Sequence, residues 1–307
     1  YSSTALYDAA IQNFANWFSF YGNRNRALVA GMTRSLVEVN NMRIGYFRIN
    51  GYSAIDTGAG TATYPNVTMR DMASPAQKRL LYLDLLALPA SGSTPNRYAV
   101  NNIGQQFKRT DAAAPVQLAC QKNAGMLFTD GYSNQGGPNA SPAQNADGGL
   151  GSPFADAHAN TLADLAAQYY TQNLRPDLEV GRVPVPVNCP SADPRIDCNT
   201  NLHMNFYGIT LGAKGDIYGV NAASTADPYA NPPAWQARQN DDPSTVDEIW
   251  HGALTSRGKF INAQSPNAIT TAMREVLQAV SEGTGPSGSI ALTGARVGDA
   301  SSTVTPE

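Results

Sequence analysis

At 307 residues the chain is long enough to bury a substantial core, as one large domain or as two small ones. Its 21 basic and 24 acidic residues give a net charge of −3 without any cluster of Lys or Arg, which argues against nucleic acid or an anionic membrane as a partner. No uninterrupted apolar run reaches about 18 residues, so we expect no membrane span.

The N-terminal segment is predicted to be helical. From about residue 5 to residue 39, apolar side chains recur at intervals of three and four, which predicts a long helix with one buried face. Gly22 and Asn23 interrupt the pattern and predict a kink. The positions expected on the buried face are Tyr7, Ile11, Phe14, Phe18, Tyr21, Leu28, Met32 and Leu36.

A strand and two helices are expected next. Residues 42–49 are rich in apolar and aromatic side chains with arginines between them, a pattern typical of a strand. The helices, 74–88 and 94–107, each begin with a hydroxyl residue followed by Pro, which is a helix-start signal because Pro suits the first helical position.

The rest of the chain alternates strands with helices. The expected strands are 125–129, 203–211 and 258–262, and the expected helices are 155–171, 244–254 and 266–280. This alternation predicts an α/β fold, a doubly wound, mostly parallel sheet with helices on both faces. From Ser281 the composition changes to Gly, Ser and Thr, so we assign residues 1–282 to one domain and residues 283–307 to a linker.

The cysteines and the composition indicate an exported protein. Cys189 and Cys198 flank a Pro-rich segment short enough to be closed by a disulfide in an oxidising compartment, although two free thiols or half of a zinc site would also fit. Cys120 is then either a buried small hydrophobe or paired outside this chain. Only 15% of residues are charged, and the chain starts at Tyr1 without a methionine, as a processed or truncated product would.

Familiar enzyme signatures are absent. The sequence has no GxSxG, HExxH, P-loop or GxGxxG motif in the required context. The three histidines, His158, His203 and His251, are interpreted as surface or packing residues. A catalytic centre that depends on histidine is therefore poorly supported.

Two polar positions are candidates for a metal site. Thr94 lies at a loop-to-helix junction, and Asp130 follows the expected strand 125–129, at the edge of the sheet where ligands bind in α/β folds. A hard cation such as Mg²⁺ prefers such oxygen ligands. The alternative is that Thr94 caps its own helix and that Asp130 forms an Asp-Gly turn. Spacing alone leaves both interpretations open.

An ordered set of motifs adds a family resemblance. The motifs are Asn13-Phe-Ala-Asn-Trp17, Gly92-Ser93-Thr94-Pro95, Cys120-Gln-Lys-Asn followed by Leu127-Phe-Thr-Asp-Gly-Tyr-Ser-Asn134, Pro153-Phe-Ala-Asp-Ala-His-Ala-Asn-Thr-Leu-Ala-Asp164 and Asp247-Glu-Ile-Trp-His-Gly-Ala-Leu254. Together they resemble the N-terminal von Willebrand factor A-like domain of the PilY family, the large adhesins associated with the type IV pilus tip. The resemblance covers nearly the whole chain.

The resemblance implies a metal-ion-dependent adhesion site that binds Mg²⁺ or Ca²⁺ at the upper edge of the sheet. Thr94 matches the threonine of the second loop of that site, and Asp130 matches the aspartate of the third. The first loop, Asp-x-Ser-x-Ser after the first central strand, should precede the long helix and is not found in this sequence. Either it is lost together with that strand, or both lie upstream of Tyr1. The segment Asp299-Ala-Ser301-Ser-Thr303 fits the spacing but follows a linker instead of an apolar strand.

The implied function is a non-enzymatic adhesion and assembly module that supports pilus biogenesis and surface attachment. Its expected place is the pilus tip or outer cell surface, reached through the periplasm, with a C-terminal β-propeller that this chain lacks. Minor pilins, the pilus tip complex and a host or abiotic surface receptor are the implied partners. The alternatives are an exported metal-dependent hydrolase using Asp130 with Asp156 or Asp164, and a structural spacer domain without a ligand.

Overall fold

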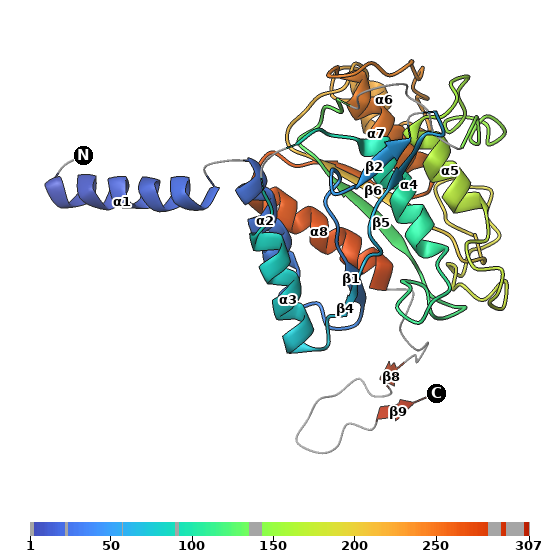
Figure 1. Cartoon of the computed structure of the whole chain (residues 1–307), viewed down its shortest axis with the longest axis horizontal. Coiled ribbons are helices and arrows are strands. Elements are labelled where there is room, and N and C mark those ends of the chain that lie inside the picture. The colour runs from blue at the N-terminus through green and yellow to red at the C-terminus, as the bar shows by residue number, and fades with distance from the viewer. Residues whose placement is uncertain are drawn as a thin grey trace.

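A three-stranded parallel sheet forms the centre of the molecule (Figure 1). The computed structural model describes residues 3–21, 24–56, 58–89, 92–134, 143–281, 290–292 and 304–306. The strands are β5 (Ala124–Phe128), β6 (Asn205–Thr210) and β7 (Phe260–Asn262), hydrogen-bonded in the order β5-β6-β7. Because all three run parallel, their carboxyl ends meet at one edge of the sheet.

Helices cover both faces of this sheet (Figure 1). On one face lie α4 (Asn96–Phe107), α5 (Leu162–Thr171) and α7 (Ser244–Thr255), and on the other lie α2 (Arg24–Ser35), α3 (Pro75–Leu86) and α8 (Pro266–Ser281). Side chains alternate along the strands, so Leu127 and Phe206 join the first core while Met126 and Ile209 join the second. These observations confirm the predicted α/β class with a parallel sheet covered on both faces.

The smaller sheets lie outside this centre. β1 (Arg43–Gly45) pairs antiparallel with β4 (Met69–Asp71), and β2 (Ala54–Asp56) pairs antiparallel with β3 (Thr61–Thr63). The predicted strand 42–49 is thus wrong beyond residue 45. A turn that places the Gly51 amide 2.9 Å from the Arg48 carbonyl redirects the chain there.

The predicted N-terminal helix is found as two helices. α1 (Thr4–Tyr21) is followed by α2, and Gly22 and Asn23 lie outside the described residues. The expected buried face is wrong for α1, because Tyr7, Ile11 and Phe14 are 49–61% exposed and the helix extends away from the body (Figure 1). Directly after α2, by contrast, the expected Leu36 is buried in one core with side chains of α3 and α8.

The start of α5 also differs from the prediction. The helix begins at Leu162 instead of residue 155, with Thr161 as its N-cap and a reciprocal capping box between Thr161 and Asp164. Asn160 has φ +61°, which no helical residue adopts, so the segment before Thr161 is a loop. The predicted capping of α3 by Ser74 is confirmed, because the Ser74 hydroxyl accepts a hydrogen bond from the Gln77 amide.

Three further elements complete the described part of the chain. They are α6 (Ala222–Ala226) and the antiparallel pair β8 (Ile290–Leu292) and β9 (Val304–Pro306). The pair lies within the predicted linker 283–307, whose other residues are outside the described ranges. None of the described helices has the length and apolar composition needed to cross a bilayer.

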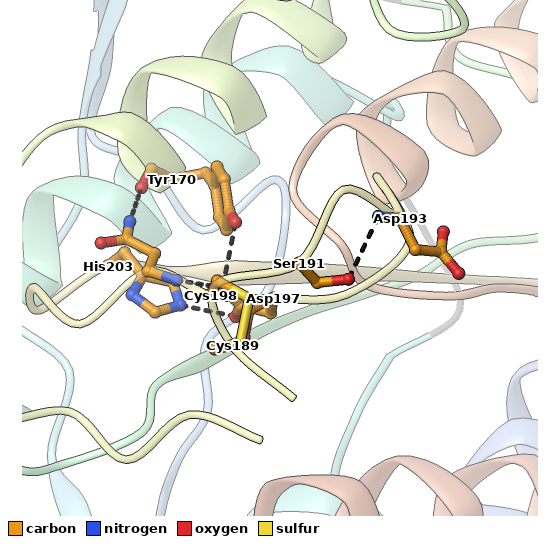
Figure 2. The surroundings of a disulfide bond; sticks show 8 residues. Tyr170, Cys189, Ser191, Asp193, Asp197, Cys198 and His203 are labelled. Atoms are coloured by element: carbon orange, nitrogen blue, oxygen red, sulfur yellow. Dashed lines mark hydrogen bonds and ion pairs between the residues drawn. A yellow bond between two sulfur atoms is a disulfide. The ribbon is translucent and has the colours of Figure 1, made fainter. Parts of the chain in front are cut away.

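Cys189 and Cys198 form a disulfide in the loop between α5 and β6 (Figure 2). Next to it, the Asp197 carboxylate accepts hydrogen bonds from the Tyr170 hydroxyl at 3.0 Å and from Asn205 Nδ2 at 2.8 Å, and lies 2.8 Å from His203 Nε2. These contacts attach the loop to α5 and β6. The remaining thiol, Cys120, is unpaired and exposed, so it is not the buried hydrophobe that one interpretation of the sequence expected.

Candidate functional site

The carboxyl edge of the sheet gathers the loops that follow β5 and β6. Asp130 and Gly131 come directly after β5, and Ala213 lies in the loop after β6. Gly131 has φ +128°, and a Cβ added there would lie 2.3 Å from the Ala213 Cβ. Glycine is therefore required at this position both by the backbone conformation and by the close approach of the two loops.

The segment before α4 lies against the segment after β5. The Thr94 amide donates to Asn134 Oδ1 at 2.5 Å, and the Ser133 hydroxyl donates to the Thr94 carbonyl oxygen at 2.7 Å. These two bonds place the loops that carry Thr94 and Asp130 side by side. Thr94 is half-buried and Asp130 is exposed. The N-cap of α4 is Pro95 without a side-chain capping bond, so the interpretation of Thr94 as a helix cap is wrong.

Asp247, in the first turn of α7, holds the loop after β6. Its carboxylate accepts hydrogen bonds from the amides of three consecutive residues: Asp216 at 2.8 Å, Ile217 at 2.9 Å and Tyr218 at 2.8 Å. Burial raises the pKa of the Asp247 carboxyl above its usual value, and the three amides oppose that shift. Sequence reasoning placed Asp247 in a motif without recognising this role.

Glu248 connects the helices beneath the same edge. Its Oε1 accepts hydrogen bonds from Arg97 Nε at 2.6 Å and from the Leu162 amide at 3.0 Å, and its Oε2 lies 3.4 Å from Arg238 Nε. Arg238 in turn donates to the Ser133 hydroxyl at 3.0 Å. The buried, charged side chains of Arg238 and Glu248 therefore connect the loop after β5 to α4, α5 and α7.

The chain is similar to three curated proteins of Pseudomonas aeruginosa, each named type IV pilus biogenesis factor PilY1. The protein of strain PAK is 30% identical over 88% of this chain. Those of strains PAO1 and UCBPP-PA14 are each 29% identical, over 88% and 96% of the chain. The predicted resemblance to the PilY family is confirmed. The chain spans only 26–28% of the length of these relatives. No family model matches it, and neither does any solved structure.

In this PilY-related chain, Asp164 has a structural task. Its Oδ2 accepts hydrogen bonds from the Thr161 amide at 2.8 Å and from the Thr161 hydroxyl at 2.9 Å, and its Oδ1 accepts one from the Asp147 amide at 3.3 Å. It is 0% exposed. These contacts occupy the carboxylate and leave it no access to a substrate, which argues against its use in a hydrolase.

The first loop of the implied adhesion site has no counterpart in the described residues. Within them no strand precedes α1, and the parallel sheet consists of β5, β6 and β7. The segment Asp299 to Thr303 lies outside the described residues. Among the described residues, the structure thus brings together the two loops that carry Thr94 and Asp130.

Proposed function

We propose that this chain is a non-enzymatic module of a type IV pilus biogenesis factor, acting in pilus assembly and in attachment to surfaces. The observation that carries the proposal is the similarity to three PilY1 proteins over 88–96% of the chain. Because the chain corresponds to about a quarter of those proteins, it would supply one part of their function.

The proposed domain has a von Willebrand factor A-like fold over residues 1–282, with residues 283–307 leading to a C-terminal β-propeller. A parallel sheet between two helical layers supports this proposal, as do the loops collected at its carboxyl edge. Such an edge is where α/β sheets bind ligands, because loop side chains and unpaired amides converge there.

The proposed contact surface is this edge, with the loops that carry Thr94 and Asp130. The polar segment 131–152 is proposed to take part, although its residues 135–142 lie outside the described ranges. A hydroxyl and a carboxylate are the oxygen ligands that Mg²⁺ or Ca²⁺ prefers. The bonds of Ser133 and Asn134 to the Thr94 backbone support a shared site, since they hold the two loops together. Two ligands are too few for either cation, so an Asp-x-Ser-x-Ser segment or a carboxylate of the partner would have to complete the site.

The proposed location is the pilus tip or outer cell surface, after export through the periplasm. The disulfide between Cys189 and Cys198 supports an oxidising compartment. Minor pilins and the pilus tip complex are the proposed assembly partners, and a host or abiotic surface is the proposed adhesion target. The small net charge of −3 fits partners other than nucleic acid.

Calorimetric titration tests the proposed metal site. Mg²⁺ and Ca²⁺ are titrated into the wild-type chain and into Asp130→Ala, with Asp8→Ala on α1 as the matched control. We expect weaker binding of one of these cations by Asp130→Ala alone. Measurable binding of equal affinity by all three proteins would exclude Asp130 as a ligand.

A cellular assay tests the function itself. The same substitutions are introduced into the full-length protein of a piliated bacterium, and pili per cell and attachment under flow are measured. The adhesion proposal predicts normal piliation with reduced attachment for Asp130→Ala. Unchanged attachment would favour a spacer domain, whereas turnover of phosphatase, esterase or glycosidase substrates by the purified chain would contradict the non-enzymatic assignment.

A further inference from the structure

A second cluster of possible ligands lies between the loop 143–160 and α7, and its residues are separate from Thr94 and Asp130. It consists of Asp147, Asp156 and His251, each with one ligand-capable atom within 4.8 Å of the others. Asp147 is 0% exposed and His251 is 2% exposed. The Asp156 side chain is 6% exposed. Three groups that bind metals are therefore enclosed together.

The Asp147 carboxylate lacks the partners that burial requires. Within the described residues, neither of its oxygens accepts a hydrogen bond. The imidazole of His251 lies beside this carboxylate, with Nε2 3.5 Å from Asp147 Oδ2. Buried carboxylate oxygens are almost always hydrogen-bonded or bound to a metal, because an unpaired buried charge is costly. The two orphaned oxygens thus indicate a missing positive partner.

The orientation of His251 leaves a ring nitrogen available as a ligand. Its Nε2 lies 2.5 Å from the Phe154 carbonyl oxygen, so we assign the hydrogen to Nε2, which donates to that oxygen. The lone pair of Nδ1 then faces Asp156 Oδ2 at 3.5 Å. Two electron-rich atoms repel each other at this distance unless a cation or a proton lies between them. A hydrogen bond from the second ring nitrogen to a carbonyl is usual for a histidine that binds a metal.

The indole of Trp235 fixes this orientation. It stacks on the His251 ring with 3.9 Å between the ring centroids and 11° between the planes, and its Nε1 donates to the Pro153 carbonyl oxygen at 2.8 Å.

The cluster also carries excess negative charge. Asp164 is buried beside Asp147 and Asp156, and the nearby guanidinium groups of Arg97 and Arg238 pair with Glu248 instead. A divalent cation would neutralise charge that the surrounding protein does not balance.

We propose that Asp147, Asp156 and His251 bind one divalent transition-metal cation, of the Zn²⁺ or Mn²⁺ kind, which holds the loop 143–160 against α7. One imidazole and two carboxylates suit these ions, whereas Mg²⁺ and Ca²⁺ prefer sites made of oxygen atoms alone. The burial of Asp147 and His251 assigns the cation a structural role. The site does not depend on the adhesion function.

Metal content and binding of the full chain test the site. The purified chain is analysed by inductively coupled plasma mass spectrometry, stripped with EDTA, and titrated calorimetrically with ZnCl₂, MnCl₂, CaCl₂ and MgCl₂ while thermal unfolding is followed in parallel. We expect one equivalent of Zn²⁺ or Mn²⁺ to bind and to raise the midpoint of unfolding. The isosteric variant Asp147→Asn should fold, as circular dichroism would show, and should lose affinity by about 100-fold or more.

Two further variants separate this site from the rest of the molecule. Asp130→Asn should bind Zn²⁺ or Mn²⁺ as the wild type does, which distinguishes the cluster from the proposed adhesion site. Asp156→Asn, in the same loop, is used in place of Asp147→Asn if that variant does not fold. The proposal is overturned if the wild type binds neither Zn²⁺ nor Mn²⁺, or if variants of the cluster bind them as tightly as the wild type.

Discussion

Arg97 and Glu248 form a buried ion pair that joins α4 to α7, with Arg97 Nε 2.6 Å from Glu248 Oε1. Both side chains are 5% exposed, and the residues are 151 positions apart in the sequence. Arg238 shares the same carboxylate and continues to Ser133 in the loop after β5. The position of that loop therefore depends on one glutamate of α7.

Removing this carboxylate should be strongly destabilising. In Glu248→Gln, the buried Arg97 and Arg238 lose the carboxylate that they share, so we expect the free energy of unfolding to fall by about 3–5 kcal/mol in urea titrations. The control is Glu275→Gln, which breaks the surface pair of Glu275 with Lys259 and should cost less than about 1 kcal/mol. Equal effects of the two variants would contradict the assignment of Glu248 as the buried anchor.

Stability should fall in acid because of Asp197. Burial tends to raise the pKa of this carboxyl, but hydrogen bonds from His203, Asn205 and Asn199 outweigh burial and hold it below the ordinary value of 3.8. The native state thus binds fewer protons than the unfolded state, so the stabilisation is present above pH 3.8 and is lost as the pH falls below it.

The variant Asp197→Asn isolates this contribution. Its unfolding free energy at pH 7 should be lower by about 1–3 kcal/mol, and the difference from wild type should shrink between pH 4 and pH 2. The exposed Asp8→Asn serves as the control. A difference from wild type that stays constant down to pH 2 would show that the charge of Asp197 is not responsible.

The disulfide should stabilise the loop between α5 and β6. Cys189 and Cys198 are nine positions apart, and closing a loop of this length restricts the unfolded chain by about 2–3 kcal/mol. We expect the double variant Cys189→Ser and Cys198→Ser to lose about that much in denaturant unfolding. Dithiothreitol should lower the stability of the wild type but leave the double variant unchanged.

A methyl group at Gly131 should disturb the carboxyl edge of the sheet. Gly131→Ala adds an atom 2.3 Å from the Ala213 Cβ at φ +128°, and we expect a loss of about 1–3 kcal/mol in thermal unfolding. Gly149→Ala is the control, because an added Cβ there meets no atom within 4 Å. If Gly131→Ala unfolded at the same midpoint temperature as the wild type, the two loops would not be in contact.

The apolar side chains of α1 should contribute little to the stability of the chain. Phe14 is 61% exposed, so Phe14→Ala is expected to change the unfolding free energy by no more than about 0.5 kcal/mol. Leu36→Ala, directly after α2, should cost about 2–5 kcal/mol, because Leu36 is 2% exposed within the core. If Phe14→Ala lowered the unfolding free energy in urea by much more than this, Phe14 would lie on a buried face of the helix, as the sequence predicts.

Local signals were sufficient for much of the fold. The helix start at Ser74 and the strand before Thr129 follow from capping chemistry and a short apolar run, which act over a few neighbouring residues. The same local reasoning failed for residues 155–161, where the capping box of Thr161 with Asp164 begins the helix later than periodicity predicts. It also failed for α1, because periodicity predicts an apolar face but not a partner to bury it.

The α/β class, the alternation of strands and helices and the position of Asp130 after a strand can be read from local sequence patterns. The contacts between distant residues depend on tertiary packing. Arg97 reaches Glu248, and His251 reaches Asp147 and Asp156, across about a hundred residues or more. The physical reason is that burial, and with it the strength of a charge, is set by packing between elements that no local pattern records.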